Sequence, residues 1–175
     1  MAVTTGYLFA GGATLVQYNS VDMGGTTGGV SISKNTDWLD FEVDQRKALV
    51  RKEAIMTKMM VKTTLAENKL YNLRVAWSMA SSALNSSSSS LMLLESLGTE
   101  EHVLLIKGPT HTVPTAAPVV NYDTRNYQLN RAVALANSEI ALNRATPTNT
   151  PVEFECLIDT AATPARWGDI WDADE

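Results

Sequence analysis

The sequence has very little of the residues on which disulfide scaffolds, metal sites and most acid–base enzymes depend. It contains one cysteine and two histidines in 175 residues. A single cysteine, Cys156, excludes a disulfide within the chain and leaves no ligand spacing for a zinc site. Histidine is the commonest general base, and neither His102 nor His111 stands near a candidate nucleophile in an informative pattern. We therefore expect no catalytic residue, no cofactor and no bound metal.

Long apolar segments are also missing. No run approaches the roughly 18 to 20 consecutive apolar residues that a membrane-spanning helix needs. The first residues, Met1 to Leu8, lack the basic start and apolar stretch that are typical of a signal peptide. Together with the single cysteine, these absences predict a protein that assembles in a reducing cytoplasm and does not insert into a membrane.

Positive charge is scarcer than negative charge. The chain has 14 Lys and Arg against 19 Asp and Glu, which gives a net charge of -5. Proteins that bind nucleic acid rely on Lys and Arg to release counterions from the phosphates, so this balance argues against such a function. It is compatible with a protein that lets nucleic acid pass without adhering to it.

What the sequence does contain is a series of alternating segments that favour strands. The length of 175 residues fits a single domain over 1–175, long enough to bury a core. About eight strands and one helix predict a mainly β (α+β) fold, either a β-sandwich or a partly closed barrel with a flanking helix. The expected strands cover 14–18, 30–33, 38–43, 54–65, 91–94, 102–107, 127–135 and 152–158.

The segment from Asp44 to Glu53 is dense in charge and interrupts the strand pattern, so we predict an exposed loop. It contains a cluster of four basic residues with no interleaved aromatic residue, which stacking on single-stranded nucleic acid would require. Contact with an acidic neighbour is the favoured interpretation. The following strand, Ala54 to Leu65, would span roughly 40 Å, which suits a curved sheet or a projecting arm. The basic residues are Arg46, Lys47, Arg51 and Lys52.

One segment, 66–79, has the pattern of a helix. Thr64 and Glu67 stand at the spacing of a capping box, in which each side chain accepts a backbone N–H at the start of the helix. An apolar stripe on the helix is expected to pack on a sheet, with the polar residues facing water. The stripe consists of Leu70, Leu73 and Trp77, and the polar residues are Glu67, Lys69 and Arg74.

The end of the chain, 160–175, is an acidic tail that contains tryptophan. Trp167, Ile170 and Trp171 are costly to leave in water, so the tail is expected to dock. Docking on its own body and docking on an adjacent subunit both stay open. Cys156 falls on the apolar face of the preceding strand and is expected in the core.

Four segments of the chain together resemble a known family. The resemblance covers roughly Gly12 to Asp159, and the segments are specific as a set. In this order they resemble the major tail-tube proteins of long-tailed bacteriophages. The segments are Gly28-Gly29-Val30-Ser31-Ile32, Glu42-Val43-Asp44-Gln45, Thr64-Leu65-Ala66-Glu67 with Leu70-Tyr71-Asn72-Leu73, and Thr148-Asn149-Thr150-Pro151-Val152-Glu153-Phe154-Glu155-Cys156-Leu157.

The resemblance implies a structural virion protein without catalytic residues, located in a tail that is expected to be non-contractile. In that family six subunits form a ring, and stacked rings form a hollow tube that conducts the genome. The inner tubes of contractile tails and of the type VI secretion system look similar in architecture. A ring of six would carry a net charge of about -30, six times -5, so an acidic lumen would repel DNA phosphates.

The partners implied by this resemblance are further copies of the chain and other tail proteins, such as an initiator, a tape measure or a terminator. Viral DNA would pass through without specific binding. The predicted assembly interface combines the basic cluster with the apolar residues of the tail. It consists of Arg46, Lys47, Arg51, Lys52, Trp167, Ile170 and Trp171.

Three other functions stay open. The chain could be another virion protein with a related β fold, such as a tail terminator, a decoration protein or a head protein. It could be a β-sandwich module that binds carbohydrate or a receptor, for which Trp38 offers an exposed aromatic ring. A small hydrolase is the least supported, because the two histidines have no convincing partners.

Overall fold

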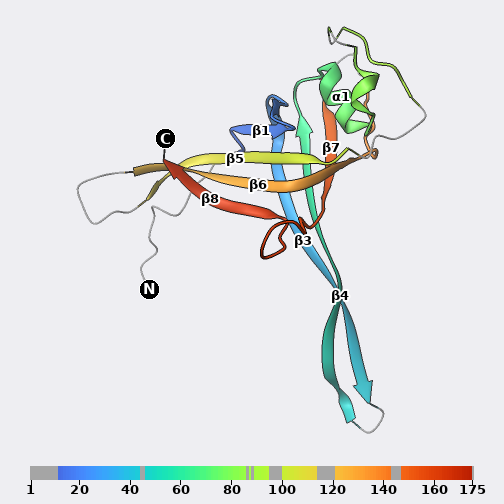
Figure 1. Ribbon diagram of the computed structural model, residues 1–175, viewed down its shortest axis with the longest axis vertical. Coiled ribbons are helices and arrows are strands. Elements are labelled where there is room, and N and C mark those ends of the chain that lie inside the picture. The colour runs from blue at the N-terminus through green and yellow to red at the C-terminus, as the bar shows by residue number, and fades with distance from the viewer. Residues whose placement is uncertain are drawn as a thin grey trace.

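The computed structural model describes residues 12–43, 46–85, 87, 89–94, 100–113, 121–142 and 147–174. Its strands form one antiparallel sheet that is not closed, and the described chain contains one α-helix (Figure 1). The predicted mainly β fold of about eight strands and one helix is thus confirmed. The strands are β1 (Leu15–Tyr18), β2 (Val21–Asp22), β3 (Thr26–Val43), β4 (Arg46–Leu65), β5 (His102–Val113), β6 (Asn121–Leu135), β7 (Thr150–Cys156) and β8 (Gly168–Asp174).

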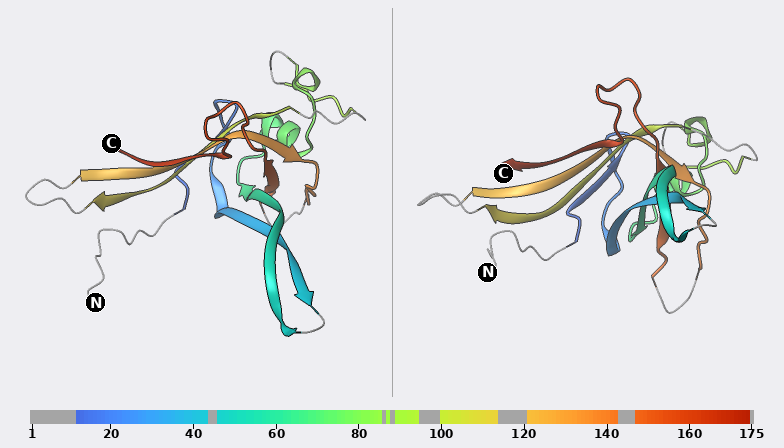
Figure 2. Two further views of the ribbon diagram at one scale, coloured as in Figure 1. Left: turned by 60° about the horizontal axis from the view of Figure 1, so that its bottom comes forward. Right: turned by 90° about the horizontal axis from the view of Figure 1, so that it is seen from below.

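The sheet has the strand order β2-β1-β5-β6-β7-β4-β3, and β8 joins it through β6. Two strands pair with the same edge of β6: β7 with residues 132–135 and β8 with residues 123–129. Strands β5, β6 and β8 run side by side, while β3 and β4 cross their direction and continue past them (Figures 1 and 2). The sheet therefore consists of two differently oriented parts that meet where β7 joins β4 to β6.

The core is formed mainly by side chains of β1, β4, β5, β6 and β7, and the helix α1 (Leu70–Ala76) adds Val75 and Ala76 to it. On β7 every second residue is buried, which confirms the predicted apolar face for Val152, Phe154 and Cys156. The prediction is wrong for Ile158, which was expected on the same face but follows the end of β7 and is exposed. Tyr18 packs on Phe154 with ring centroids 5.1 Å apart. Burial raises the pKa of the Cys156 thiol to about 12, so it stays protonated and unreactive at neutral pH.

The helix is shorter than predicted and begins at Leu70, with Lys69 as the N-cap and no side-chain hydrogen bond at the cap. The capping-box prediction is wrong because Thr64 is part of β4, where it pairs with Pro151 of β7. The Glu67 carboxylate accepts a hydrogen bond from the Gly25 N–H instead, at 3.4 Å. Pairing with a distant strand has here overridden a local signal.

The face that the helix buries also differs from the prediction. The expected stripe of Leu70, Leu73 and Trp77 is only half-buried. The amide of Asn72 donates hydrogen bonds to the carbonyls of Met23 and Glu67, which fixes the helix in another rotation. The residues that become buried are Asn72, Arg74, Val75 and Ala76.

The predicted charged loop at 44–53 is wrong for the residues that the structure describes. Residues 46–53 form the first part of β4, and Asp44 lies outside the described residues. The two strands expected at 30–33 and 38–43 are one strand of 18 residues, β3. A charged segment can form a strand when both of its faces meet water, because every side chain is then solvated.

Other strand boundaries move as well. The segment 91–94 was expected to be a buried strand, but Met92, Leu93 and Leu94 are exposed and Leu91 makes an isolated bridge to Leu84. Strand β5 continues beyond Lys107, through an irregularity between Lys107 and Thr110 that accommodates a proline in the strand. Strand β6 begins six residues before the predicted start at 127 and ends at 135.

Candidate functional site

Part of the β3–β4 ribbon projects beyond the body as a two-stranded arm. Strand β7 pairs with β4 only over Met59–Leu65. The rest of β4 pairs with β3 alone, and no other described strand reaches it. We define the arm as residues 35–43 of β3 and 46–58 of β4; it extends away from the body in every view (Figures 1 and 2).

The arm carries large apolar side chains in water. Ile55 is 65% exposed and Trp38 is 53% exposed. Leu39, Phe41 and Met56 are exposed as well. Such residues normally mark a surface that another molecule covers, since contiguous exposed apolar patches are uncommon on monomers.

The arm has two different faces, because residues that pair across two strands lie on the same side. Phe41 pairs with Arg51 and Leu39 pairs with Glu53, so these four side chains share one face. The other face combines two further pairs of residues. These are Trp38 with Ala54 and Asp40 with Lys52.

Each arm face holds one cation between an aromatic ring and a carboxylate. The Arg51 guanidinium lies 5.9 Å from the centroid of the Phe41 ring and 3.5 Å from the Glu53 carboxylate. On the other face, the Lys52 ammonium lies 5.8 Å from the centroid of Trp38. Exposed pairs of this kind contribute at most about 1 kcal/mol each, so they orient side chains more than they stabilise the arm.

The predicted basic cluster is therefore divided. Arg51 and Lys52 are consecutive strand residues and project from opposite faces of the arm. The backbones of Arg46 and Lys47 lie in the first residues of β4, and their side chains lie outside the described part of the chain. The sequence did not predict that the exposed apolar residues of the arm lie together, because the charged segment between them was expected to be a loop.

The predicted tail residues lie in and next to strand β8, which pairs with β6 of the same chain. Trp167 packs against the core, with the Lys34 ammonium 5.2 Å from its ring centroid. Arg125 of β6 binds the Asp172 carboxylate with two hydrogen bonds of 2.7 and 2.9 Å. Docking on its own body is thus observed for the tail, although Ile170 remains 67% exposed.

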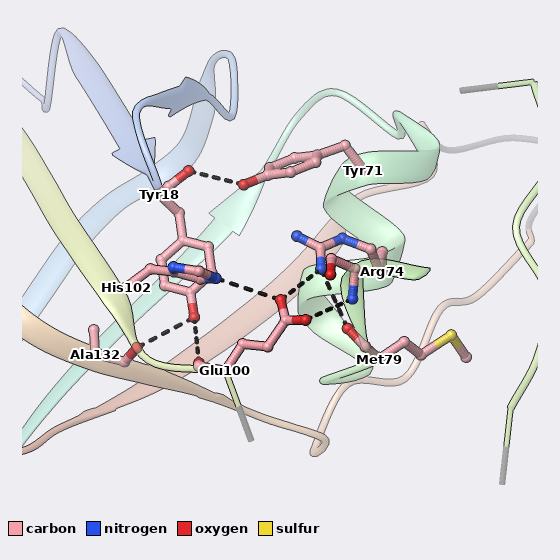
Figure 3. A network of polar contacts seen from close by, with 8 residues as sticks. Tyr18, Tyr71, Arg74, Met79, Glu100, His102 and Ala132 are labelled. Carbon is pink, nitrogen blue, oxygen red and sulfur yellow. Dashed lines mark hydrogen bonds and ion pairs between the residues drawn. The ribbon is translucent and has the colours of Figure 1, made fainter. Parts of the chain in front are cut away.

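The densest group of titratable side chains lies between α1 and the sheet (Figure 3). Arg74, whose side chain is only 5% exposed, binds the Glu100 carboxylate at 3.1 Å. The Tyr18 hydroxyl shares its one proton between the carbonyls of Glu100 and Ala132, at 3.0 and 3.2 Å. The Tyr71 hydroxyl donates to the Tyr18 carbonyl at 2.8 Å.

The Glu100 carboxyl is the centre of this network. Its partial burial acts to raise its pKa, but hydrogen bonds from the Ser81 N–H, from His102 and from Arg74 outweigh that effect. The result is a pKa lowered to about 2. Opposite charge and donated hydrogen bonds both favour the ionised carboxylate.

This network serves as a brace between helix and sheet and leaves no room for a substrate. The cavity beside Tyr18, Arg74 and Glu100 has a volume of 10 Å³, about the minimum for one water molecule. Backbone carbonyls of the chain itself accept many of the hydrogen bonds in this network. His102 packs edge-on against Tyr18, with ring centroids 5.2 Å apart.

The described residues do not form a metal site. Among them, no three His, Cys, Asp or Glu side chains are grouped as a metal site would need. The described helices include none with the length and hydrophobicity needed to cross a membrane. The side chain of His111 lies outside the described part, and Trp38 lies on the arm with Lys52 over its ring.

No protein-family model and no curated protein matches this chain.

Proposed function

We propose that this chain is a structural subunit that works by assembling with further copies of itself. More specifically, we propose a major tail-tube subunit of a long-tailed bacteriophage, with rings of six stacked into a hollow tube for the genome. The observation that carries this proposal is the projecting arm with its exposed apolar side chains. The family resemblance in the sequence supports the specific assignment.

The arm is energetically hard to explain in an isolated monomer. A two-stranded ribbon is at best marginally stable in water, and its free edges can pair with other strands. The large side chains on its described surface include two aromatic residues and an arginine, types that interfaces favour. Because Trp38 and Phe41 lie on opposite faces, partners on both faces of the arm would bury them and would stabilise the ribbon at the same time.

The charge of the chain fits the same function. A ring of six would carry a net charge of about -30, six times -5. This field would keep DNA phosphates from adhering to the tube wall during passage. The partners in this proposal are copies of the chain together with the tail proteins that start, measure and end the tube.

Electron microscopy of the purified protein over a concentration series tests the proposal. We expect rings or stacked hollow tubes from the native chain, and monomers from a Leu39→Ser, Phe41→Ser variant with an unchanged circular dichroism spectrum. Leu142→Ser is the matched control, because Leu142 is 83% exposed and lies outside the arm. It should assemble like the native chain.

Two outcomes would change the assignment. Normal tubes from the double variant would remove this arm face from the interface. A native protein that stays monomeric at every concentration would move the assignment toward a tail terminator, a decoration protein or a binding module. The copy number of the protein in purified particles would then separate these alternatives, since a terminator forms a single ring.

A further inference from the structure

We infer that a groove between β3, β6 and β8 is the receptor for the Phe41 face of the arm of a second copy. This inference rests on the proposed self-assembly and names the surface that receives the arm. The groove is lined by residues from four elements and from the segment before β8. Its apolar lining residues are Ile32, Met59, Tyr127, Leu129, Trp167 and Ile170.

The size of the groove matches one large side chain. Its volume is 150 Å³. An apolar cavity of about this size accepts benzene in a well-studied engineered case, so a phenyl ring is a suitable occupant. Phe41 is the exposed phenyl group of the arm, and Leu39 lies two residues away on the same face.

The arm cannot fill the groove of its own chain. Ile32, in the wall of the groove, and Phe41, on the arm, belong to the same strand β3. Nine residues separate them, which corresponds to about 30 Å at about 3.3 Å per residue. The strand would have to break for Phe41 to reach the groove, so the occupant must come from another copy.

The charges next to the two surfaces complement each other. Arg166 and Asp169, at the groove, form an ion pair of 3.1 Å with both side chains 44% exposed. Arg51 and Glu53, beside Phe41, form a similar exposed pair. On docking, the two pairs can exchange partners, with Arg51 facing Asp169 and Arg166 facing Glu53, without leaving a charge unpaired.

The contact is heterologous where the arm of each copy continues to a new copy, whereas two copies that exchange arms would close a symmetric dimer. Each copy then has one donor surface and one receptor surface. Contacts of this type produce closed rings or open stacks, depending on the rotation between copies. The inference therefore gives a physical route from the single chain to a tube.

Cysteine cross-linking of two singly substituted proteins tests the contact. Arg51→Cys and Asp169→Cys copies, which keep Phe41 and the apolar lining of the groove, are mixed and oxidised, and the native Cys156 does not interfere because it is buried. We expect roughly tenfold more disulfide-linked heterodimer than in a control mixture of Arg51→Cys with Leu142→Cys, because docking raises the effective concentration of the thiols. Equal yields in the two mixtures would overturn the inference.

A complementation experiment tests the arm–groove contact without cross-linking, and native assemblies larger than a dimer distinguish a heterologous contact from an exchange of arms between two copies. Phe41→Asp removes the arm surface, and Ile170→Asp removes the receptor surface. Both positions are exposed, so both variants should fold. Each variant alone should be monomeric in analytical ultracentrifugation, while an equal mixture should stop at a dimer that pairs one intact arm with one intact groove. A mixture that stays monomeric would overturn the inference.

The two proposals can fail separately. If tubes form but the 51–169 cross-link stays at the control level, the self-assembly proposal stands and the groove is not the receptor. If the 51–169 dimer forms but neither rings nor tubes appear at any concentration, the arm–groove contact stands and the tube assignment fails.

Discussion

The arm and the junction between α1 and the sheet use the same kinds of residue in opposite ways. At the junction, Arg74, Glu100 and Tyr18 are held by hydrogen bonds within the chain, and the arginine side chain is buried. On the arm, Arg51, Glu53 and Phe41 touch one another but remain in water. The first group completes the folded chain, whereas the second group has surface left for a partner. This contrast separates residues that stabilise the monomer from residues available for assembly.

The strongest test of this contrast compares two phenylalanines. Phe154 is fully buried in the core, and Phe41 is exposed on the arm. We expect Phe154→Ala to lower the free energy of unfolding by about 4 kcal/mol, because it leaves a cavity. Phe41→Ala should change it by less than about 0.5 kcal/mol. Urea unfolding of the monomer measures both, and equal losses would mean that the arm packs on the body.

The second test compares two arginines. Arg74→Met leaves the Glu100 carboxylate without its buried partner and should cost about 2 kcal/mol, less than for a fully buried pair because Glu100 is partly exposed. Arg51→Met should cost less than about 0.5 kcal/mol, since the Arg51–Glu53 pair is solvated. Urea unfolding near pH 7 gives both values. A neutral Arg74→Met would show that the brace does not stabilise the fold.

The third test uses pH. The pKa of Glu100 is lowered in the folded chain from an ordinary value of 4.5 to about 2. The folded state therefore binds fewer protons than the unfolded state between these values. The stability that Glu100 contributes is present above about pH 4.5 and is lost as the pH falls toward 2. We expect a loss on the order of 2 kcal/mol from this group.

The Glu100→Gln variant is the control for the pH test. It cannot ionise, so its free energy of unfolding should fall less steeply below pH 4.5 than that of the native chain. Thermal unfolding monitored by circular dichroism at several pH values gives the comparison. Parallel curves for the two proteins would contradict the assignment of this carboxylate.

The last test reverses the charge on the arm and is expected to have little effect on the monomer. Replacing Arg46, Lys47, Arg51 and Lys52 by glutamate should change the free energy of unfolding by less than about 1 kcal/mol. Assembly should be blocked, because the arm could no longer offer cations to a partner. Sedimentation and microscopy of the same sample separate folding from assembly, and normal tubes would remove these side chains from the interface.

The sequence predicted local features better than pairing between distant segments. Val152, Phe154 and Cys156 were assigned correctly to one buried face, because alternation along a strand is visible in seven residues. The cap at Thr64 failed because Pro151, far along the chain, pairs with it. Arg74 was expected in water, and nothing near it in the sequence indicates that Glu100 would meet it.

The candidate site was predictable in part. A long strand over 54–65 indicated a possible arm. The expected docking of the tail on its own chain is observed for strand β8 and for Trp167, whereas a role of the exposed Ile170 in an interface stays a prediction. The exposed apolar faces of the arm were not predicted. Alternation in Leu39 and Phe41 indicates an apolar face, but it does not tell whether a second layer covers that face.

By itself, the sequence determined the fold class and the composition of the surfaces. Alternation, a short helical segment and a net charge of -5 are properties of the chain and do not depend on which segments meet. The tertiary structure decided that residues 26–43 are one strand, that 168–174 complete the sheet, and that the arm extends past β7. Each of these features depends on how far a distant partner strand extends. Where the partner strand ends, the remaining residues have no neighbour to pair with on that edge and are no longer part of the body.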